Sequence, residues 1–210
     1  MEIENAFYYF ADPMCSWCYG FAPEVSAVYD QNRDRFGFHL IMGGLRPHGT
    51  ETFGGLADML KHHWKQVAER SGQPFDYSVL DHEDRVYDTE PPCRAVRVMR
   101  EIKPEAEFEF FKQIQKAFYR EGKEMDKIDT YLNLLPELEV DPAQFKEQFE
   151  SEEMKLQTTY DFHQARDWGI TGYPALVVGW EGELFLIAKG FSDRETLFRI
   201  LDEITIKQKS

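Results

Sequence analysis

The hydrophobic pattern near the N-terminus predicts two strands with a helix between them. Residues 6–10 are apolar and aromatic without interruption, which is typical of a short buried strand. Residues 18–32 then carry apolar positions three and four apart, which predicts a helix, and Pro23 is expected to kink it. Residues 36–42 are again apolar. Strand, helix and strand in this order predict a βαβ unit with parallel strands.

The middle of the chain, residues 48–150, shows helical patterns and no convincing strand. Three apolar stripes at helical spacing comprise Leu56, Met59, Leu60, Trp64 and Val67; Phe108, Phe111, Ile114 and Phe118; and Ile128, Tyr131, Leu132 and Leu135. The pair Asp141-Pro142 predicts a further helix start, because Asp can cap and Pro is tolerated at the first helical position. We interpret residues 48–150 as an all-helical insertion subdomain within a domain formed by residues 1–47 and 151–210.

The C-terminal part predicts a helix, a hairpin and a last helix. The helix should run over residues 151–168 and end at Gly169. Residues 175–178 and 184–188 are short apolar runs around a turn, which predicts an antiparallel hairpin. The sequence of residues 192–195, SDRE, has the form of a capping box for the last helix. The whole chain therefore predicts an α/β fold in the order βαβ…αββα.

Charge and composition exclude several classes of function. The chain has 38 acidic and 24 basic side chains, a formal charge of −14, which argues against nucleic acid or an anionic membrane surface as a partner. No apolar run approaches the roughly 20 residues of a transmembrane helix. The N-terminal residues lack the basic and apolar regions of a signal peptide, so a cytoplasmic location is expected. Nothing in the composition indicates an oligomeric state.

The three cysteines indicate redox chemistry. Cys15 and Cys18 form a C-x-x-C pair, while Cys93 is far away in sequence. In a cytosolic protein such a pair is either metal-binding or redox-active. A structural zinc site needs four ligands, and this sequence has no second C-x-x-C; the adjacent His62 and His63 would point to different helix faces. We therefore expect a redox pair and no metal.

Two segments carry a resemblance to a known family. Residues 10–20, FADPMCSWCYG, and residues 172–176, GYPAL, resemble the DsbA-like branch of the thioredoxin superfamily, and most closely its cytoplasmic FrnE-like members. The resemblance implies a thioredoxin-like fold with a helical insertion and a thiol–disulfide oxidoreductase or isomerase. It also implies that Pro174 is cis and packs beside the C-x-x-C pair. It implies no cofactor, although glutathione could serve as reductant or substrate, and it implies thiol- or disulfide-containing proteins or small thiols as partners.

Position along the helix assigns roles to the two cysteines. A thiolate at the start of a helix is favoured by free backbone N–H groups and by the helix dipole. Cys15 is therefore expected to attack, and Cys18 to resolve the mixed disulfide. Ser16 and Trp17 between them are uncharged, and Asp12 either opposes ionisation of Cys15 or is only a turn residue. The absence of a cation between the cysteines, and an Asp12 carboxylate that opposes ionisation, would each move the reduction potential of the pair away from the strongly oxidising range.

Residues around the pair are candidates for substrate binding. Ser16 and Trp17 would line the site, and in the resemblance Tyr173 and Pro174 would face the cysteines, with the tyrosine backbone pairing with an extended peptide. We expect Cys93 to be a small buried hydrophobic residue and not a third redox thiol, because a lone cysteine is more often of the first kind.

Two other functions remain open. Kappa-class glutathione transferases and hydroxychromene-carboxylate isomerases share the same plan, but they typically carry a serine at the active position. A peptide-binding module without redox chemistry is the third possibility.

Overall fold

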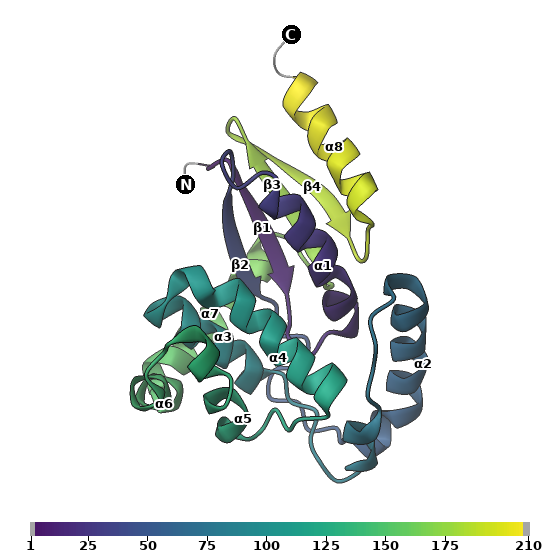
Figure 1. Cartoon of the computed structure of the whole chain (residues 1–210), viewed down its shortest axis with the longest axis vertical. Coiled ribbons are helices and arrows are strands. Elements are labelled where there is room, and N and C mark those ends of the chain that lie inside the picture. The colour runs from purple at the N-terminus through teal and green to yellow at the C-terminus, as the bar shows by residue number, and fades with distance from the viewer. Residues whose placement is uncertain (1–2, 208–210) are drawn as a thin grey trace.

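A four-stranded mixed sheet forms the centre of the computed structural model, which describes residues 3–207 (Figure 1). The strands are β1 (Ala6–Ala11), β2 (Gly37–Met42), β3 (Ala175–Trp180) and β4 (Glu183–Lys189). Their order is β2-β1-β3-β4; β1 pairs parallel with β2 and antiparallel with β3, and β3 pairs antiparallel with β4. This confirms the βαβ unit and the C-terminal hairpin.

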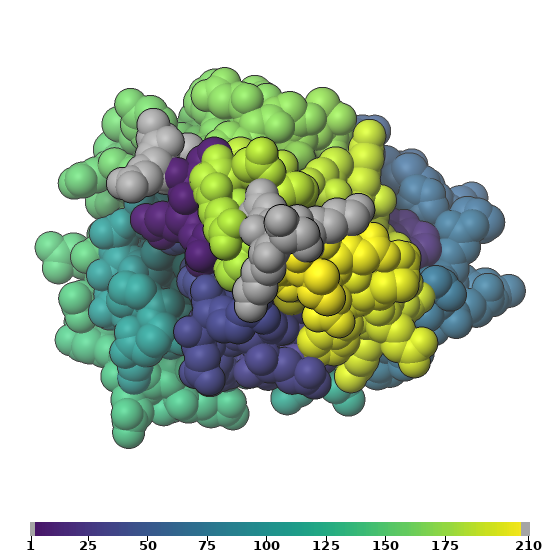
Figure 2. Space-filling model, turned by 90° about the horizontal axis from the view of Figure 1, so that it is seen from above, coloured from purple at the N-terminus to yellow at the C-terminus, as the bar shows by residue number. Residues whose placement is uncertain are grey.

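Helices cover both faces of the sheet and extend beyond one of its ends. The helices are α1 (Ser16–Asp30), α2 (Phe53–Ser71), α3 (Glu90–Ile102), α4 (Glu107–Glu121), α5 (Ile128–Leu132), α6 (Pro142–Glu150), α7 (Glu152–Asp167) and α8 (Arg194–Lys207). Short 3₁₀ segments are η1 (Ser78–Asp81), η2 (Pro104–Ala106) and η3 (Leu135–Leu138). Seen from above, α7 lies on one side of the strands, and α1 and α8 lie on the other (Figure 2). None of the helices within residues 3–207 combines the length and the apolar character needed to cross a bilayer.

The uninterrupted apolar run in β1 is explained by burial on both faces. Phe7 and Tyr9 belong to the core that includes α1 and α8, and Tyr9 contacts Phe21 of α1 edge to face. Tyr8 and Phe10 point to the opposite face, where both rings pack against Trp168 after α7. A strand buried on both sides has no polar alternation, because neither of its faces meets water.

Helix α1 starts earlier than the apolar spacing predicts. It begins at Ser16 and continues through Pro23 to Asp30, so the expected range of 18–32 was two residues late. Cys15 is its N-cap, with extended backbone angles, and its carbonyl accepts the first helical hydrogen bond from the Tyr19 amide at 3.0 Å. The earlier start is functionally important because it places the C-x-x-C pair in the first turn.

The insertion is helical, as predicted, but not throughout. Gly72, with φ of 73°, ends α2, and residues 72–89 are irregular apart from η1. A single isolated bridge joins Thr52 to Val86. Of the first predicted stripe, Met59 is 39% exposed, while its other members are buried.

One core joins the insertion to the rest of the fold. Tyr9 of β1 contacts Phe111 of α4 at a centroid distance of 6.1 Å, and both belong to the same buried cluster. Because this core is shared, the structure marks no boundary between the insertion and the rest of the fold, and the predicted subdomain bounds at residues 48 and 150 stay a prediction.

The cap of α8 differs from the predicted capping box. The helix begins at Arg194, and the Thr196 amide donates to Asp193 Oδ1 at 2.9 Å. Asp193, not Ser192, is the capping residue. Both residue types are good caps, and the sequence pattern alone chose the wrong one.

A buried guanidinium links the insertion to the sheet. Arg100 of α3 donates to both carboxylate oxygens of Asp161 in α7, at 3.0 and 2.8 Å, and its Nε donates to Glu107 of α4 at 2.6 Å. It also donates to the Leu40 carbonyl of β2. Asp161 in turn accepts the Met42 amide at 3.1 Å. Removing Arg100 would leave two buried carboxylates, Glu107 and Asp161, without their shared cation.

Glu107 in this cluster should make stability depend on pH. Burial raises its pKa from 4.5 to about 7, although Arg100 opposes the shift. The folded chain therefore holds more protons than the unfolded chain between those values, and stability falls as pH rises through that window. We expect Glu107→Gln to flatten the decline in unfolding free energy between about pH 5 and pH 8 by about 1–3 kcal/mol. Urea unfolding at both pH values measures this.

The exposed Glu109→Gln on the same helix is the matched control for Glu107→Gln. Its carboxylate is half exposed and pairs with Lys112 at the surface, so it should leave the decline unchanged. A Glu107→Gln variant that keeps the full decline of the parent would contradict the assignment.

Candidate active site

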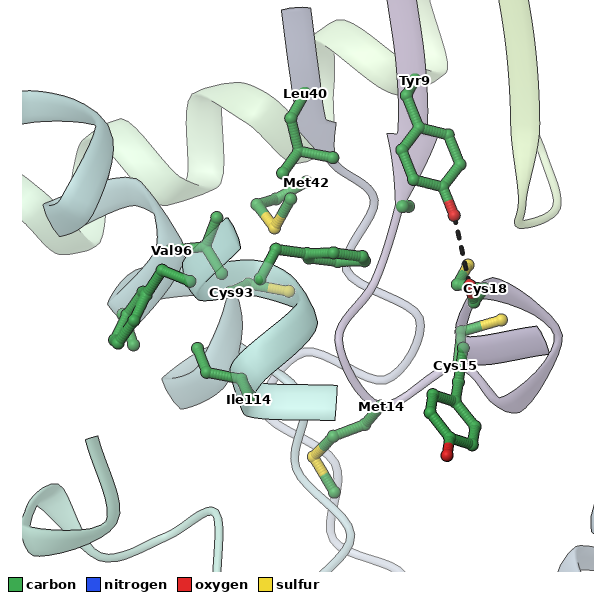
Figure 3. Close-up of a cluster of buried hydrophobic side chains, with 14 of the residues drawn as sticks. Tyr9, Met14, Cys15, Cys18, Leu40, Met42, Cys93, Val96 and Ile114 are labelled. Carbon is green, nitrogen blue, oxygen red and sulfur yellow. Dashed lines mark hydrogen bonds between the residues drawn. The ribbon is translucent and has the colours of Figure 1, made fainter. Parts of the chain in front are cut away.

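The C-x-x-C pair lies where β1 meets α1. The loop after Ala11 folds back on itself, because the Cys15 amide donates to the Asp12 carbonyl at 3.1 Å. Cys15 caps α1, and Cys18 lies in its first turn. Figure 3 shows the two side chains together at the start of the helix. Both are free thiols in this structure.

The two thiols differ in access. Cys15 is 5% exposed, whereas Cys18 is completely buried. Burial and the neighbouring Cys15 raise the pKa of the Cys18 thiol well above its ordinary value, while the Asp12 backbone lowers it. The Tyr9 hydroxyl donates to the Cys18 carbonyl at 3.3 Å and holds that turn (Figure 3). A substrate from solvent therefore meets Cys15 first.

The loop before β3 faces Cys15. The Tyr173–Pro174 bond is cis, as the resemblance implies, and the Cys15 thiol donates to the Tyr173 carbonyl at 3.5 Å. The Tyr173 hydroxyl donates to the Gly43 carbonyl at 2.6 Å. A Cβ at Gly43 would lie 2.2 Å from the tyrosine ring, so only glycine allows this contact. Burial raises the pKa of Tyr173 to about 12, so the phenol stays protonated.

An open groove of about 690 Å³ runs beside the pair. One wall is aromatic: Trp17 and Phe191 lie 6.4 Å apart between centroids, and Tyr173 adjoins them. Gln66, Glu69 and Arg70 of α2 also line the groove. Ser16 is partly exposed at the first position of α1. The four substrate-binding candidates from the sequence are thus near the cysteines.

Asp12 is a turn residue, which was one of the two alternatives from the sequence, and its side chain also contacts more distant segments. Its fully buried carboxylate accepts the Met14 amide at 2.8 Å, the Leu45 amide at 2.7 Å and the Cys93 thiol at 3.5 Å. Burial raises the pKa of Asp12, and these hydrogen bonds and one from Thr89 oppose the shift. Asp12 therefore ties the loop before Cys15 to the connection after β2 and to α3.

Cys93 is buried beside this carboxylate, apart from the pair. In Figure 3 it lies on α3 near Met42, on the other side of the loop from Cys15 and Cys18. Burial and Asp12 raise the pKa of its thiol well above the ordinary value. The expectation of a small buried residue fits this position.

Several residues of the site carry no signal in the sequence. The Tyr87 hydroxyl donates to the Met14 carbonyl, and Gly43 makes room for Tyr173. Arg70 is one of many charges on an exposed helix face. An acid immediately after a buried strand and close to a C-x-x-C pair is the single signal that could have identified the role of Asp12.

No metal site is evident in the part of the chain that the structure describes: residues 3–207 contain no group of three His, Cys, Asp or Glu side chains arranged to hold an ion.

Comparison with known proteins identifies the family. The thioredoxin family model matches residues 8–183. A proposed protein disulfide isomerase from Nitrosomonas europaea is 35% identical, with a TM-score of 0.86 over 95% of this chain and 97% of that one. The cytosolic disulfide reductase DsbM from Pseudomonas aeruginosa has 24% identity and a TM-score of 0.81, over 95% and 98% of the two chains. DsbM has also been solved with glutathione.

Two more distant proteins are also similar. The ClpXP adapter protein SpxH of Halalkalibacterium halodurans is 21% identical over 175 residues, which cover 81% of this chain. The chain spans only 57% of the length of that curated relative. A 2-hydroxychromene-2-carboxylate isomerase has the same fold at 15% identity, with a TM-score of 0.59 over 95% of this chain and 94% of that one. The predicted thioredoxin-like fold with a helical insertion is confirmed, and the chain belongs to the thioredoxin family, which is consistent with the resemblance of its sequence to the DsbA-like branch.

Proposed function

We propose that this protein is a thiol–disulfide oxidoreductase or isomerase that works through Cys15 and Cys18. The observation that carries the proposal is the position of Cys15, which is the N-cap residue of α1 and whose thiol contacts the Tyr173 carbonyl of the cis-proline loop. A helix N-terminus favours the thiolate, which is the form that attacks disulfides. Cys18, three residues later in the same turn, supplies the second thiol.

The exchange proceeds in two steps. The Cys15 thiolate attacks one sulfur of a substrate disulfide; a mixed disulfide forms, and the other substrate sulfur leaves as a thiolate and takes up a proton. Cys18 then loses its proton and attacks Cys15 Sγ, which releases the second substrate thiol and leaves a Cys15–Cys18 disulfide. Two electrons have passed from the protein to the substrate, and the reverse sequence oxidises a substrate dithiol. The same chemistry needs no bound cofactor.

Small thiols are the proposed partners that return the pair to its starting state. Glutathione is the leading one, because the similar DsbM structure was solved with it. The proposed location is the cytoplasm, where glutathione is abundant and keeps thiols reduced. Disulfide-containing proteins are further candidate substrates, since the loop at Tyr173 presents backbone groups to an extended peptide.

The proposal predicts a reversible bond between two specific cysteines. After equilibration of the reduced protein with mixtures of glutathione and glutathione disulfide, differential alkylation and mass spectrometry should show Cys15 and Cys18 losing their free thiols together. Cys93 should stay reduced throughout, because it is buried and hydrogen-bonded to Asp12. Cys93→Ala should therefore titrate like the parent. Failure of Cys15 and Cys18 to bond in any mixture would refute the function.

Two alternatives make different predictions. A glutathione transferase or isomerase of the hydroxychromene-carboxylate type would turn over its substrate without any change in the redox state of Cys18. A peptide-binding module would keep its affinity in Cys15→Ser and would need no reactive pair. Both cysteines lie in the first turn of α1, and Cys15 keeps some exposure while Cys18 has none, which favours the redox function.

A further inference from the structure

Arg70 of α2 lines the groove beside the ring of Phe191. Its guanidinium lies 5.2 Å from the Phe191 ring centroid, and its Nη2 is 3.6 Å from Asp193 Oδ2. The groove also contains Trp17, which follows Cys15 by two residues, and Tyr173, whose carbonyl accepts the Cys15 thiol. A molecule held in the groove therefore contacts both Arg70 and residues beside the reactive sulfur.

The ion pair of Arg70 is weak enough to be replaced. The side chains of Arg70 and Asp193 are 59% and 48% exposed, and exposed pairs contribute little net free energy. Asp193 does not depend on Arg70 for its position, because its Oδ1 accepts the Thr196 amide and caps α8. Another carboxylate entering the groove can therefore take over the guanidinium without disturbing the fold.

The aromatic contact prepares Arg70 for this role. A guanidinium that lies over an aromatic ring is partly oriented by that contact, so it loses less freedom when it binds a carboxylate. The chain as a whole carries a charge of −14, which repels anionic substrates, so an anionic substrate needs a local cation at the site. The groove volume of about 690 Å³ is within the range of small-molecule sites, roughly 300–1,000 Å³.

We propose that Arg70 binds a carboxylate of the substrate. The protein thereby selects small thiols and disulfides that carry a carboxylate near the reacting sulfur, such as glutathione disulfide. This proposal rests on the proposed function. In it, helix α2 of the insertion recognises the charge of the substrate. Asp193 competes for the same guanidinium and weakens the interaction.

The test compares two disulfides that differ in charge. Glutathione disulfide carries carboxylates, and bis(2-hydroxyethyl) disulfide is neutral. Arg70→Gln should lower kcat/KM for glutathione disulfide about 5- to 10-fold and leave that for the neutral disulfide unchanged. Asp193→Asn should raise kcat/KM for glutathione disulfide about 2- to 5-fold, because Asn still caps the helix but no longer competes.

Arg199→Gln is the matched control, because it removes the same charge from an exposed ion pair with Glu203 on α8. It should change neither rate. Binding of S-methylglutathione, which cannot exchange, gives a second readout: calorimetry should show weaker binding to Arg70→Gln and tighter binding to Asp193→Asn than to the parent.

The outcomes separate the two proposals. If Arg70→Gln slows both disulfides equally, or neither, and binds S-methylglutathione like the parent, the role of Arg70 is refuted while the redox function stands. If the parent exchanges with neither disulfide, the redox function is refuted; the binding measurement then still decides whether Arg70 binds a carboxylate.

Discussion

Cys15→Ser should abolish disulfide exchange, and Cys18→Ser should accumulate a mixed disulfide on Cys15. The reason is the difference in access between the two thiols: Cys15 is 5% exposed and Cys18 is completely buried. A substrate sulfur can reach Cys15. Cys18 reacts only afterwards, when it attacks the mixed disulfide on Cys15. We expect the rate of exchange to fall at least about 1,000-fold in Cys15→Ser, as for loss of other catalytic nucleophiles.

Measurement requires the single variants and a background without the third thiol. Each variant is made in Cys93→Ala, incubated with glutathione disulfide, quenched in acid and analysed by intact mass. Cys18→Ser should carry one glutathione adduct, and Cys15→Ser should carry none. Ser is the suitable replacement because it is close to Cys in size and its hydroxyl can still form hydrogen bonds in place of the thiol.

Equal adducts on both variants would show that the attacking thiol has been misassigned. An adduct on Cys15→Ser alone would reverse the roles and would require the first turn of α1 to open, since Cys18 is buried in the closed form. Either result would contradict the order of attack inferred from the structure.

The strands and the position of the reactive pair were predictable because they depend on short-range patterns. The apolar run of β1 is uniform since both faces are buried, and the C-x-x-C pair follows it directly. The glycines after α7 and in the hairpin turn, Gly169 and Gly182, have positive φ of 72° and 84°, which is the usual use of glycine at such sites. Local chemistry decides these features, so the sequence displays them.

The contacts that complete the site were not predictable because they join distant segments. Asp12 and Cys93 are 81 residues apart, and Arg70 and Asp193 are further apart still. No periodicity records such a pairing. The Ser192 capping prediction failed for a different reason: the chain has two good caps in succession, and Asp193 is the one that accepts the Thr196 amide.

Asp12→Asn should destabilise the protein by at least about 2 kcal/mol, even though the two side chains have the same shape. The groups that hydrogen-bond to the Asp12 carboxylate all donate to it: the Met14 and Leu45 amides, the Cys93 thiol and the Thr89 hydroxyl. An asparagine has one oxygen and one NH₂ group, so its NH₂ must face a donor. At least one buried N–H then loses its partner, and leaving such a group unsatisfied costs about 1–3 kcal/mol.

The loop before Cys15 should loosen in the same variant, because the Met14 amide is one of the groups that Asp12 holds. Urea unfolding gives the loss of stability, and hydrogen exchange at Met14 and Leu45 reports the loosening at the two amides directly. Cys93→Ser keeps a donor to Asp12 and is the matched control, with an expected cost below about 1 kcal/mol, whereas Cys93→Val removes the donor and should cost more. An Asp12→Asn protein as stable as the parent, with both amides still protected, would mean that the carboxylate does not hold the active-site loop.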